Sequence, residues 1–198
     1  MLLAQLLSER SRIFKPQIQV EAIHVVMDNL PIDPNINWIK QYCSQLELPL
    51  HIIHTSFSIT SDKKKTPCFL CSWHRRKAIF EYATYHGFNK IALGHHQDDI
   101  IITWLMNITF EGNASPAMHP VVAMHHYPIS IIRPLCLVHE EWIANYSDTH
   151  NTVHQQTPCP HSHSTRRTDM TSIFHQLQAL NPEARYSLWH AITKTNTA

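Results

Sequence analysis

Strand-like and helix-like patterns alternate along this chain of 198 residues, and no other feature limits its fold as strongly. Short apolar runs rich in β-branched residues are typical of buried strands, whereas apolar residues three and four positions apart are typical of helices. The strand-like segments are 18–27, 49–54, 90–94 and 129–135, and the helical segments are 3–7, 38–46, 72–86, 98–110 and 139–150. This order predicts an α/β fold with a parallel sheet covered by helices, in which ligands bind beyond the carboxyl ends of the strands.

Length and composition predict one well-packed domain. The chain is 43% hydrophobic and 16% charged, which suits a single core and is thin for two. We expect the α/β domain to span residues 1–165. Residues 166–198 should form a tail of two short helices on either side of Pro182.

Charge and cysteine content limit the classes of function. The formal net charge is only +1, so a nucleic acid could be held only by local basic patches. Five cysteines, an odd number, and an opening segment without the basic region of a secretory leader predict a reducing, cytoplasmic location. No apolar stretch is long enough for a transmembrane helix, so no membrane partner is expected. The seventeen histidines are scattered and do not form a terminal tag.

Three cysteines lie in similar local sequences. Cys68 and Cys71 stand in the segment T-P-C-F-L-C, and Cys159 stands far along the chain in T-P-C-P-H. Together they could hold an iron–sulfur cluster that keeps one iron open. With His161 or His163 as a fourth ligand they could instead form a closed tetrahedral zinc site. Spacing alone leaves both metals open.

Basic residues follow the cysteine pair and end one strand. Arg75, Arg76 and Lys77 form a run that is either a solvated surface or a contact for RNA phosphates. Arg133 ends an apolar strand and is costly to bury without a partner, so we expect it to meet a phosphate or a carboxylate.

A second polar group follows the strand at residues 90–94. Gly94 and His95 open the segment G-H-H-Q-D-D, which leads into a helix and places Asp98 and Asp99 in its first turn. Acids in this position commonly cap the helix. An adjacent acid pair can also hold Mg²⁺ against nucleotide phosphates, and both readings stay open.

Four apolar or aromatic residues are expected to have structural roles. Cys43 and Cys136 lie in apolar patterns and should be inert core thiols, and Trp104 and Trp142 should be packing residues.

Several motifs in a fixed order carry a family resemblance. C-x-x-C-S-x-x-R-R at residues 68–76 is followed by K-I-A-L-G-H-H-x-D-D at 90–99, and then by F-E-G, I-R-P-L and T-P-C. This order resembles the tRNA 2-thiocytidine synthetases of the PP-loop ATP pyrophosphatase superfamily. The resemblance extends from about residue 18 into the 190s.

The resemblance implies a fold and a reaction. The fold would be the Rossmann-like parallel sheet of the adenine nucleotide alpha hydrolase type. The enzyme would use ATP to activate the C2 carbonyl of cytidine 32 in the tRNA anticodon loop, and sulfur would then replace the oxygen. The expected partners are tRNA, ATP and a sulfur donor such as a cysteine desulfurase, with a homodimer as a candidate assembly.

The resemblance also implies roles for individual residues. Cys68, Cys71 and Cys159 would be the catalytic ligands of a [4Fe-4S] cluster. The ATP and Mg²⁺ site would be formed by Gly94, His95, Asp98 and Asp99, and the RNA or nucleotide phosphates would meet Arg75, Arg76 and Arg133.

The sequence departs from the family in two places. Ser162 stands where the second cysteine pair of the family has its last cysteine, which a three-thiolate cluster tolerates. The phosphate-binding segment S-G-G-x-D-S and the first strand before it do not occur, and residues 1–7 resemble the helix that follows them. Either the true start lies upstream, or the loop is lost together with ATP cleavage. The alternative function is therefore a non-catalytic relative that binds tRNA or zinc.

Overall fold

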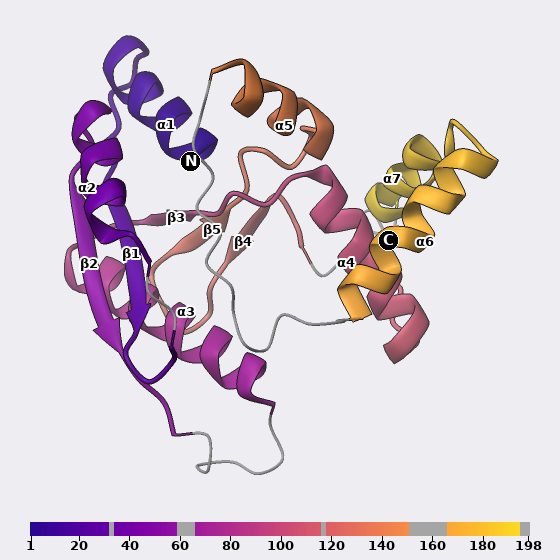
Figure 1. Cartoon of the computed structure of the whole chain (residues 1–198), viewed down its shortest axis with the longest axis horizontal. Coiled ribbons are helices and arrows are strands. Elements are labelled where there is room, and N and C mark those ends of the chain that lie inside the picture. Colours follow the sequence, from indigo (N-terminus) through magenta and orange to yellow (C-terminus); the bar gives the residue numbers. More distant parts are fainter. Residues whose placement is uncertain (32–33, 59–65, 116–117, 151–165, 195–198) are drawn as a thin grey trace. The chain divides into compact units, whose positions relative to one another are not determined.

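The computed structural model describes residues 1–31, 34–58, 66–115, 118–150 and 166–194. Helices and strands alternate over most of this length, as Figure 1 shows. The helices are α1 (Leu2–Ile13), α2 (Ile36–Gln45), α3 (Pro67–Tyr85), α4 (Gln97–Glu111), α5 (Glu140–Thr149), α6 (Arg166–Leu180) and α7 (Ala184–Lys194). The strands are β1 (Ala22–Met27), β2 (Leu50–Thr55), β3 (Lys90–Ala92), β4 (Val121–Ala123) and β5 (Ser130–Ile132). The predicted α/β class and the helical tail around Pro182 are confirmed.

The described residues group into two compact units. The first unit comprises residues 1–91, 123–130 and 147–150, and the second comprises residues 92–122, 131–146 and 166–194. The tail helices α6 and α7 therefore share a unit with α4. The domain boundary that we expected at residue 165 stays a prediction.

A parallel strand pair forms the centre of the first unit. Residues of β1 and β2 pair in register from Ala22 with Leu50 to Met27 with Thr55, and α3 contacts both strands. Buried residues from β1, α3 and the loops after the strands make the core between them: Val25, Met27, Leu30, Phe57 and Leu70. The strand that we predicted from residue 18 begins only at Ala22, because its partner strand begins at Leu50.

Helix α3 starts five residues earlier than the predicted helix at 72–86. Thr66 caps it, with its side-chain oxygen accepting a hydrogen bond from the Phe69 amide at 3.3 Å, and Pro67 occupies the first turn. Proline suits this position because its ring presets the helical φ angle and its missing N–H would have no partner there. The earlier start places Cys68 and Cys71 inside the helix.

Three short strands form a second sheet in the order β3-β5-β4. The amide of Leu93 bonds to the carbonyl of Ile132, and the amide of Ser130 bonds to the carbonyl of Asn89, which is a parallel pattern for β3 and β5. The amide of Arg133 donates a hydrogen bond to the carbonyl of Pro120, and the amide of Met124 donates to the carbonyl of Ile129. This pattern makes β4 antiparallel to β5. We predicted a loop over residues 112–128, which was wrong for β4.

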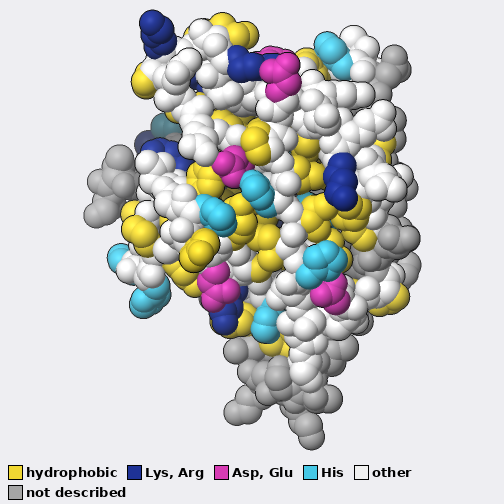
Figure 2. Space-filling model, turned by 90° about the vertical axis from the view of Figure 1, so that its left-hand side faces the viewer, with side chains coloured by type: hydrophobic (Ala, Val, Ile, Leu, Met, Phe, Trp, Pro, Cys, Tyr) yellow, Lys and Arg dark blue, Asp and Glu magenta, His cyan; other side chains and the backbone are white. Residues whose placement is uncertain are grey.

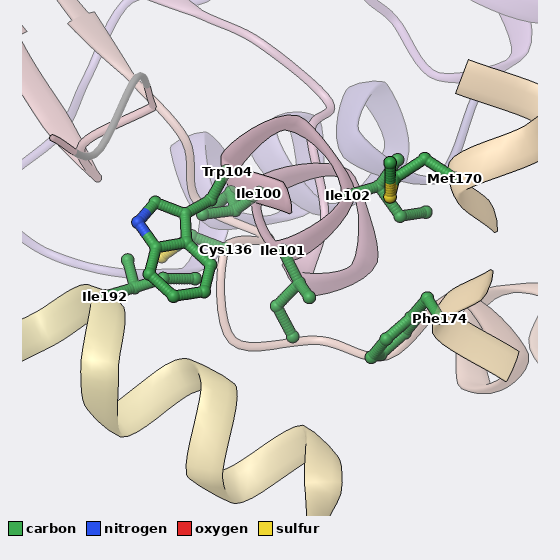
Figure 3. Close-up of a cluster of buried hydrophobic side chains, with 8 residues drawn as sticks. All are labelled: Ile100, Ile101, Ile102, Trp104, Cys136, Met170, Phe174 and Ile192. Atoms are coloured by element: carbon green, nitrogen blue, oxygen red, sulfur yellow. The ribbon is translucent and has the colours of Figure 1, made fainter. Parts of the chain in front are cut away.

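The first half of α4, which is buried and has apolar residues on several sides, forms the core of the second unit. Ile100, Ile101 and Ile102 follow one another in α4, and each is at most 2% exposed. Figure 3 shows these side chains surrounded by Met170 and Phe174 from α6 and Ile192 from α7. A helix that is apolar on several sides has to be covered by several elements, which here come from the tail.

Of the four residues expected to have structural roles, three are buried and one is exposed. Cys43 and Cys136 are buried, and burial raises the pKa of each thiol, as expected for inert core cysteines. Trp104 is buried, with its indole N–H donating to the Ala114 carbonyl at 2.8 Å. Trp142 is 56% exposed, so the prediction that it packs in the core was wrong.

Two further expectations concerned the scatter of the histidines and the lack of a transmembrane helix. Figure 2 shows several histidines spread among apolar side chains on one face, in keeping with their scatter along the sequence. Among the helices that the structure describes, none combines the length and the apolar character needed to cross a membrane.

The core of the second unit can be tested with two isoleucines of one helix. Ile101→Ala should lower the free energy of unfolding by about 2–5 kcal/mol, because it removes a fully buried side chain and leaves a cavity. Ile108→Ala removes the same atoms from a side chain that is 38% exposed, and should cost less than about 1 kcal/mol. Urea unfolding measures both values. Equal losses would contradict the assignment of Ile101 to the core.

Candidate functional site

Cys68 lies in the first turn of α3, and Cys71 lies three residues farther on, at the start of the second turn. This spacing places them on neighbouring positions of one side of the helix. Cys68 is exposed and Cys71 is half-buried, so a metal group could be reached from solvent. The positive end of the helix dipole lies beside them and favours a group that carries negative charge. The cysteine pair therefore fits two ligands of a metal centre.

The third cysteine of the predicted site, Cys159, lies outside the described residues. Within the described ranges, no group of three or more His, Cys, Asp or Glu side chains is arranged to hold a metal ion. The three-cysteine cluster site accordingly stays a prediction, and two of its three ligands, Cys68 and Cys71, lie within the described residues.

Two of the predicted phosphate-binding residues lie one turn farther along the same helix. Arg75 and Arg76 are both exposed on α3. Burial, and to a smaller extent the positive charge of Arg75, lowers the pKa of His24 on β1. Both guanidinium groups are thus open to solvent near the cysteine pair.

The second predicted cluster surrounds the start of α4. Gly94 is exposed in the turn after β3, and His95 beside it is half-buried. The Asp99 carboxylate accepts a hydrogen bond from the His96 amide at 3.0 Å, so it caps the helix. The Gln97 amide donates to the Val138 carbonyl at 2.9 Å, which fixes the turn to the segment before α5.

Asp98 is buried in a network that joins three helices. Its carboxylate accepts hydrogen bonds from the Arg185 guanidinium of α7 at 2.6 Å and from the Glu140 amide of α5 at 2.9 Å. Burial by itself would raise the pKa of Asp98. The nearby His96, with its Nδ1 3.8 Å from the carboxylate, and the hydrogen bonds from Arg185 and the Glu140 amide outweigh burial and hold this pKa well below its usual range. Asp98 is therefore a carboxylate held in its charged form by His96, by the start of α5 and by Arg185 of the tail.

Asp99 has a partner of the same kind. The Arg167 guanidinium of α6 donates to its carboxylate, opposite the atom that caps the helix. His96 lies beside both acids, with its Nε2 3.3 Å from Asp99. Burial would lower the pKa of His96, but the nearby carboxylates of Asp98, Asp99 and Glu140 raise it above its ordinary value. Both acids of the predicted Mg²⁺ site are thus bound to arginines.

Arg133 lies at the end of β5 and is buried. Its guanidinium donates to the backbone carbonyl of His119, and its amide donates to the carbonyl of Pro120 at 2.9 Å. These bonds tie the β4 and β5 strands together. Of the three arginines predicted to meet phosphates, Arg75 and Arg76 are exposed, whereas Arg133 has a structural contact.

The sequence analysis missed Arg167 and Arg185. Arg185 is separated by 87 residues from Asp98, and its guanidinium also packs over the Phe174 ring with the cation 5.2 Å from the centroid. The one signal available was the pair of uncompensated acids at the start of α4, because a buried carboxylate requires a cationic or hydrogen-bonding partner. That signal does not say which arginine supplies it.

Comparison with known families decides the class of the chain. Residues 1–168 match the PP-loop domain family. The chain belongs to this family. The fold and the order of motifs described above agree with that membership.

Curated relatives share one name. A tRNA-cytidine(32) 2-sulfurtransferase of Legionella pneumophila (strain Corby) is 34% identical over 159 residues, which are 78% of this chain and 56% of the relative. Those of Stenotrophomonas maltophilia and Methylococcus capsulatus are 36% and 40% identical, over 67% and 55% of this chain and over 44% and 39% of the relatives. The chain thus spans about half the length of the curated relatives that it matches.

A solved structure has the same fold. The U34-tRNA thiolase NcsA from Methanococcus maripaludis, determined with its [4Fe-4S] cluster, superposes with a TM-score of 0.72. The match covers 98% of this chain and 67% of the thiolase chain at 18% sequence identity. At this identity the likeness concerns the fold alone.

The Asp98–Arg185 pair should contribute strongly to stability. Arg185→Met keeps most of the apolar stem but leaves the buried Asp98 without its cation, and should lower the free energy of unfolding by about 3–5 kcal/mol. The matched control is Arg12→Met, which breaks an exposed pair with Glu47 and should cost less than about 1 kcal/mol. Chemical unfolding at neutral pH compares them. Similar losses in the two variants would show that the Asp98 network is not a buried pair.

The raised pKa of His96 makes its contribution to stability depend on pH. A raised folded-state pKa stabilises fully below the unfolded value of about 6.5, and this stabilisation is lost as the pH rises through the folded value. The difference in unfolding free energy between wild type and His96→Gln should therefore shrink between pH 6 and pH 9. Unfolding titrations at several pH values measure it, and a difference that grows with pH would contradict the sign.

Proposed function

We propose that this chain acts in ATP-dependent thiolation of tRNA, making 2-thiocytidine at position 32 of the anticodon loop. One observation carries the proposal: curated relatives that are 34–40% identical are named tRNA-cytidine(32) 2-sulfurtransferase. The cysteine pair at the start of α3 supports it, because sulfur transfer through a metal cluster requires closely spaced thiolates.

In this proposal Cys68, Cys71 and Cys159 hold a [4Fe-4S] cluster. Three thiolates on four irons leave one iron with an open position that can carry sulfur. The exposure of Cys68 and the half-burial of Cys71 suit a group that must be held by the protein and still meet a substrate. Zinc is the competing metal, since two thiolates of α3 would serve it equally well.

The nucleotide would bind at the turn between β3 and α4. Gly94 and His95 lie there, beside the positive end of the α4 dipole, which favours phosphate groups. A role of Asp98 and Asp99 as Mg²⁺ ligands would require their oxygens to be shared with Arg185 and Arg167 or released by them. The proposed binding of ATP and Mg²⁺ is therefore coupled to the contact between α4 and the tail.

The RNA would be bound by the basic residues of α3. Arg75 and Arg76 are exposed next to the cysteine pair, where phosphate contacts would position the tRNA near the metal group. Arg133 fits this role less well because its guanidinium donates to the His119 carbonyl. A sulfur donor such as a cysteine desulfurase, a homodimer and a cytoplasmic location complete the proposal.

A second candidate is a non-catalytic relative that binds tRNA or zinc. Its support is the pairing of both Asp98 and Asp99 with arginines, an arrangement that stabilises the fold without any metal. The two candidates differ in whether ATP is consumed and in the metal that is bound.

The proposal predicts the behaviour of cysteine variants. The chain, reconstituted anaerobically with iron and sulfide, should absorb broadly in the visible and form 2-thiocytidine from tRNA, ATP and a sulfur donor. Cys68→Ser and Cys71→Ser should each lose the absorption and the product, since a cluster ligand is removed. Cys43→Ala, in the core thiol of α2, should retain both. Mass spectrometry of digested tRNA measures the product.

Two outcomes separate the candidates. A reconstituted chain that binds tRNA and ATP but forms no 2-thiocytidine would overturn the sulfurtransferase and favour the non-catalytic relative. A colourless protein with one zinc per chain, bound through Cys68 and Cys71, would overturn the iron–sulfur cluster.

A further inference from the structure

We propose that α3 carries a stacking platform for unpaired RNA bases, made of Phe69 and Trp73 and flanked by Arg76 and Lys77. The inference rests on the proposed function only for the identity of the RNA, which would be the single-stranded loop of a tRNA. It assigns to Phe69, Trp73 and Lys77 a role that the family resemblance does not give them.

The four side chains of the platform lie on one side of the helix. Counted from Phe69, Trp73 lies four residues farther along the helix, Arg76 seven and Lys77 eight. This is the spacing of one helical face. Phe69 is 50% exposed and Trp73 is 49% exposed. Two large aromatic side chains that stay half-exposed side by side on a surface helix are typical of a binding surface.

Trp73 is held in place by its neighbours. The edge of its ring meets the His74 ring, with centroids 4.8 Å apart and planes at 78°. His74 is itself stacked on the buried Phe57, with centroids 5.8 Å apart, so the contact is anchored in the core of the first unit. A ring that is already oriented loses little conformational freedom when a base stacks on it.

The charge around the platform selects the class of partner. Arg75, Arg76 and Lys77 are consecutive, and the one acidic residue of α3 is Glu81, whose carboxylate lies 3.7 Å from the Lys77 ammonium and leaves the two arginines without an acidic partner on this helix. The ammonium of Lys77 lies 5.5 Å from the centre of the Trp73 ring. Aromatic rings beside cations are the surface that binds single-stranded nucleic acid, because bases stack on the rings while phosphates meet the cations.

Trp142 is a second exposed tryptophan, but acidic residues surround it where basic residues surround Trp73. It is 56% exposed on α5 and stacks on His139, with centroids 4.1 Å apart and planes at 23°, whereas Trp73 meets His74 edge-on. Its helix begins with Glu140 and Glu141, which repel phosphate. Trp142 is therefore a matched control: an equally exposed indole supported by a histidine, in an acidic setting.

The platform predicts a selective loss of affinity for single strands. Fluorescence anisotropy would measure binding of the full chain to a labelled ten-nucleotide RNA and to a duplex of the same sequence, without ATP or sulfur donor. Trp73→Ala should weaken binding of the single strand roughly 5- to 150-fold and that of the duplex much less, because duplex bases are already stacked. Trp73→Phe should restore most of the affinity.

Other variants separate stacking from charge and from folding. Arg76→Ala should lower the slope of log affinity against log salt by roughly 0.7, whereas Trp73→Ala should leave the slope unchanged. Trp142→Ala should bind as wild type does. Every variant should keep the thermal unfolding midpoint and the metal content of wild type, so that a loss of affinity is not a loss of structure.

Three results would overturn the platform. Trp73→Ala could bind the single strand like wild type, or weaken single strand and duplex equally. Alternatively, Trp73 could matter for a labelled poly-glutamate peptide and not for RNA, which would assign the surface to an acidic protein segment. These measurements are independent of thiolation: absence of 2-thiocytidine with Trp73-dependent RNA binding would reject the proposed enzyme and keep the platform.

Discussion

A carboxylate buried as deeply as that of Asp98 requires partners, and the second unit is arranged so as to supply them. The cost of removing a charge from water is large, and it is offset here by a guanidinium from α7, an amide from α5 and the neighbouring His96. Below this network, the apolar sides of α4 are covered by α6 and α7. The tail is therefore part of the structure that positions the start of α4, and a change of charge at this point would act on the whole unit.

Helix α3 combines three kinds of chemistry within two turns and a half. Its cap and its proline start the helix early enough to bring Cys68 and Cys71 onto one side of its first two turns. The next turn bears exposed arginines and an exposed tryptophan supported by a histidine. These groups lie on one rigid element, but successive helical residues turn by about 100°, so the cysteine pair and the face that carries Phe69 and Trp73 point to different sides of α3.

Most of the elements could be predicted from the sequence because their patterns are local. The strands and helices at the predicted places reflect β-branched runs and helical spacing, and the parallel pairing of β1 with β2 follows from their alternation with helices. Strand β4 escaped prediction, because three residues in a segment rich in Pro, His and Met carry no pattern of their own and are extended only by pairing with β5. The early start of α3 could have been predicted, since a threonine followed by a proline is a helix-start signal.

For the candidate site, the sequence by itself determined which residue types stand in the first turns of α3 and α4. The thiols, the acids and the basic run are contiguous in the chain, and helix geometry alone puts each group on one turn. Only the tertiary structure decided the charge environment of the acids, the burial of Arg133 and the exposure of Trp73 and Trp142. The physical reason is range: helical and strand patterns depend on neighbours within a few residues, whereas burial and ion pairing depend on segments as remote as Asp98 and Arg185, which only packing brings together.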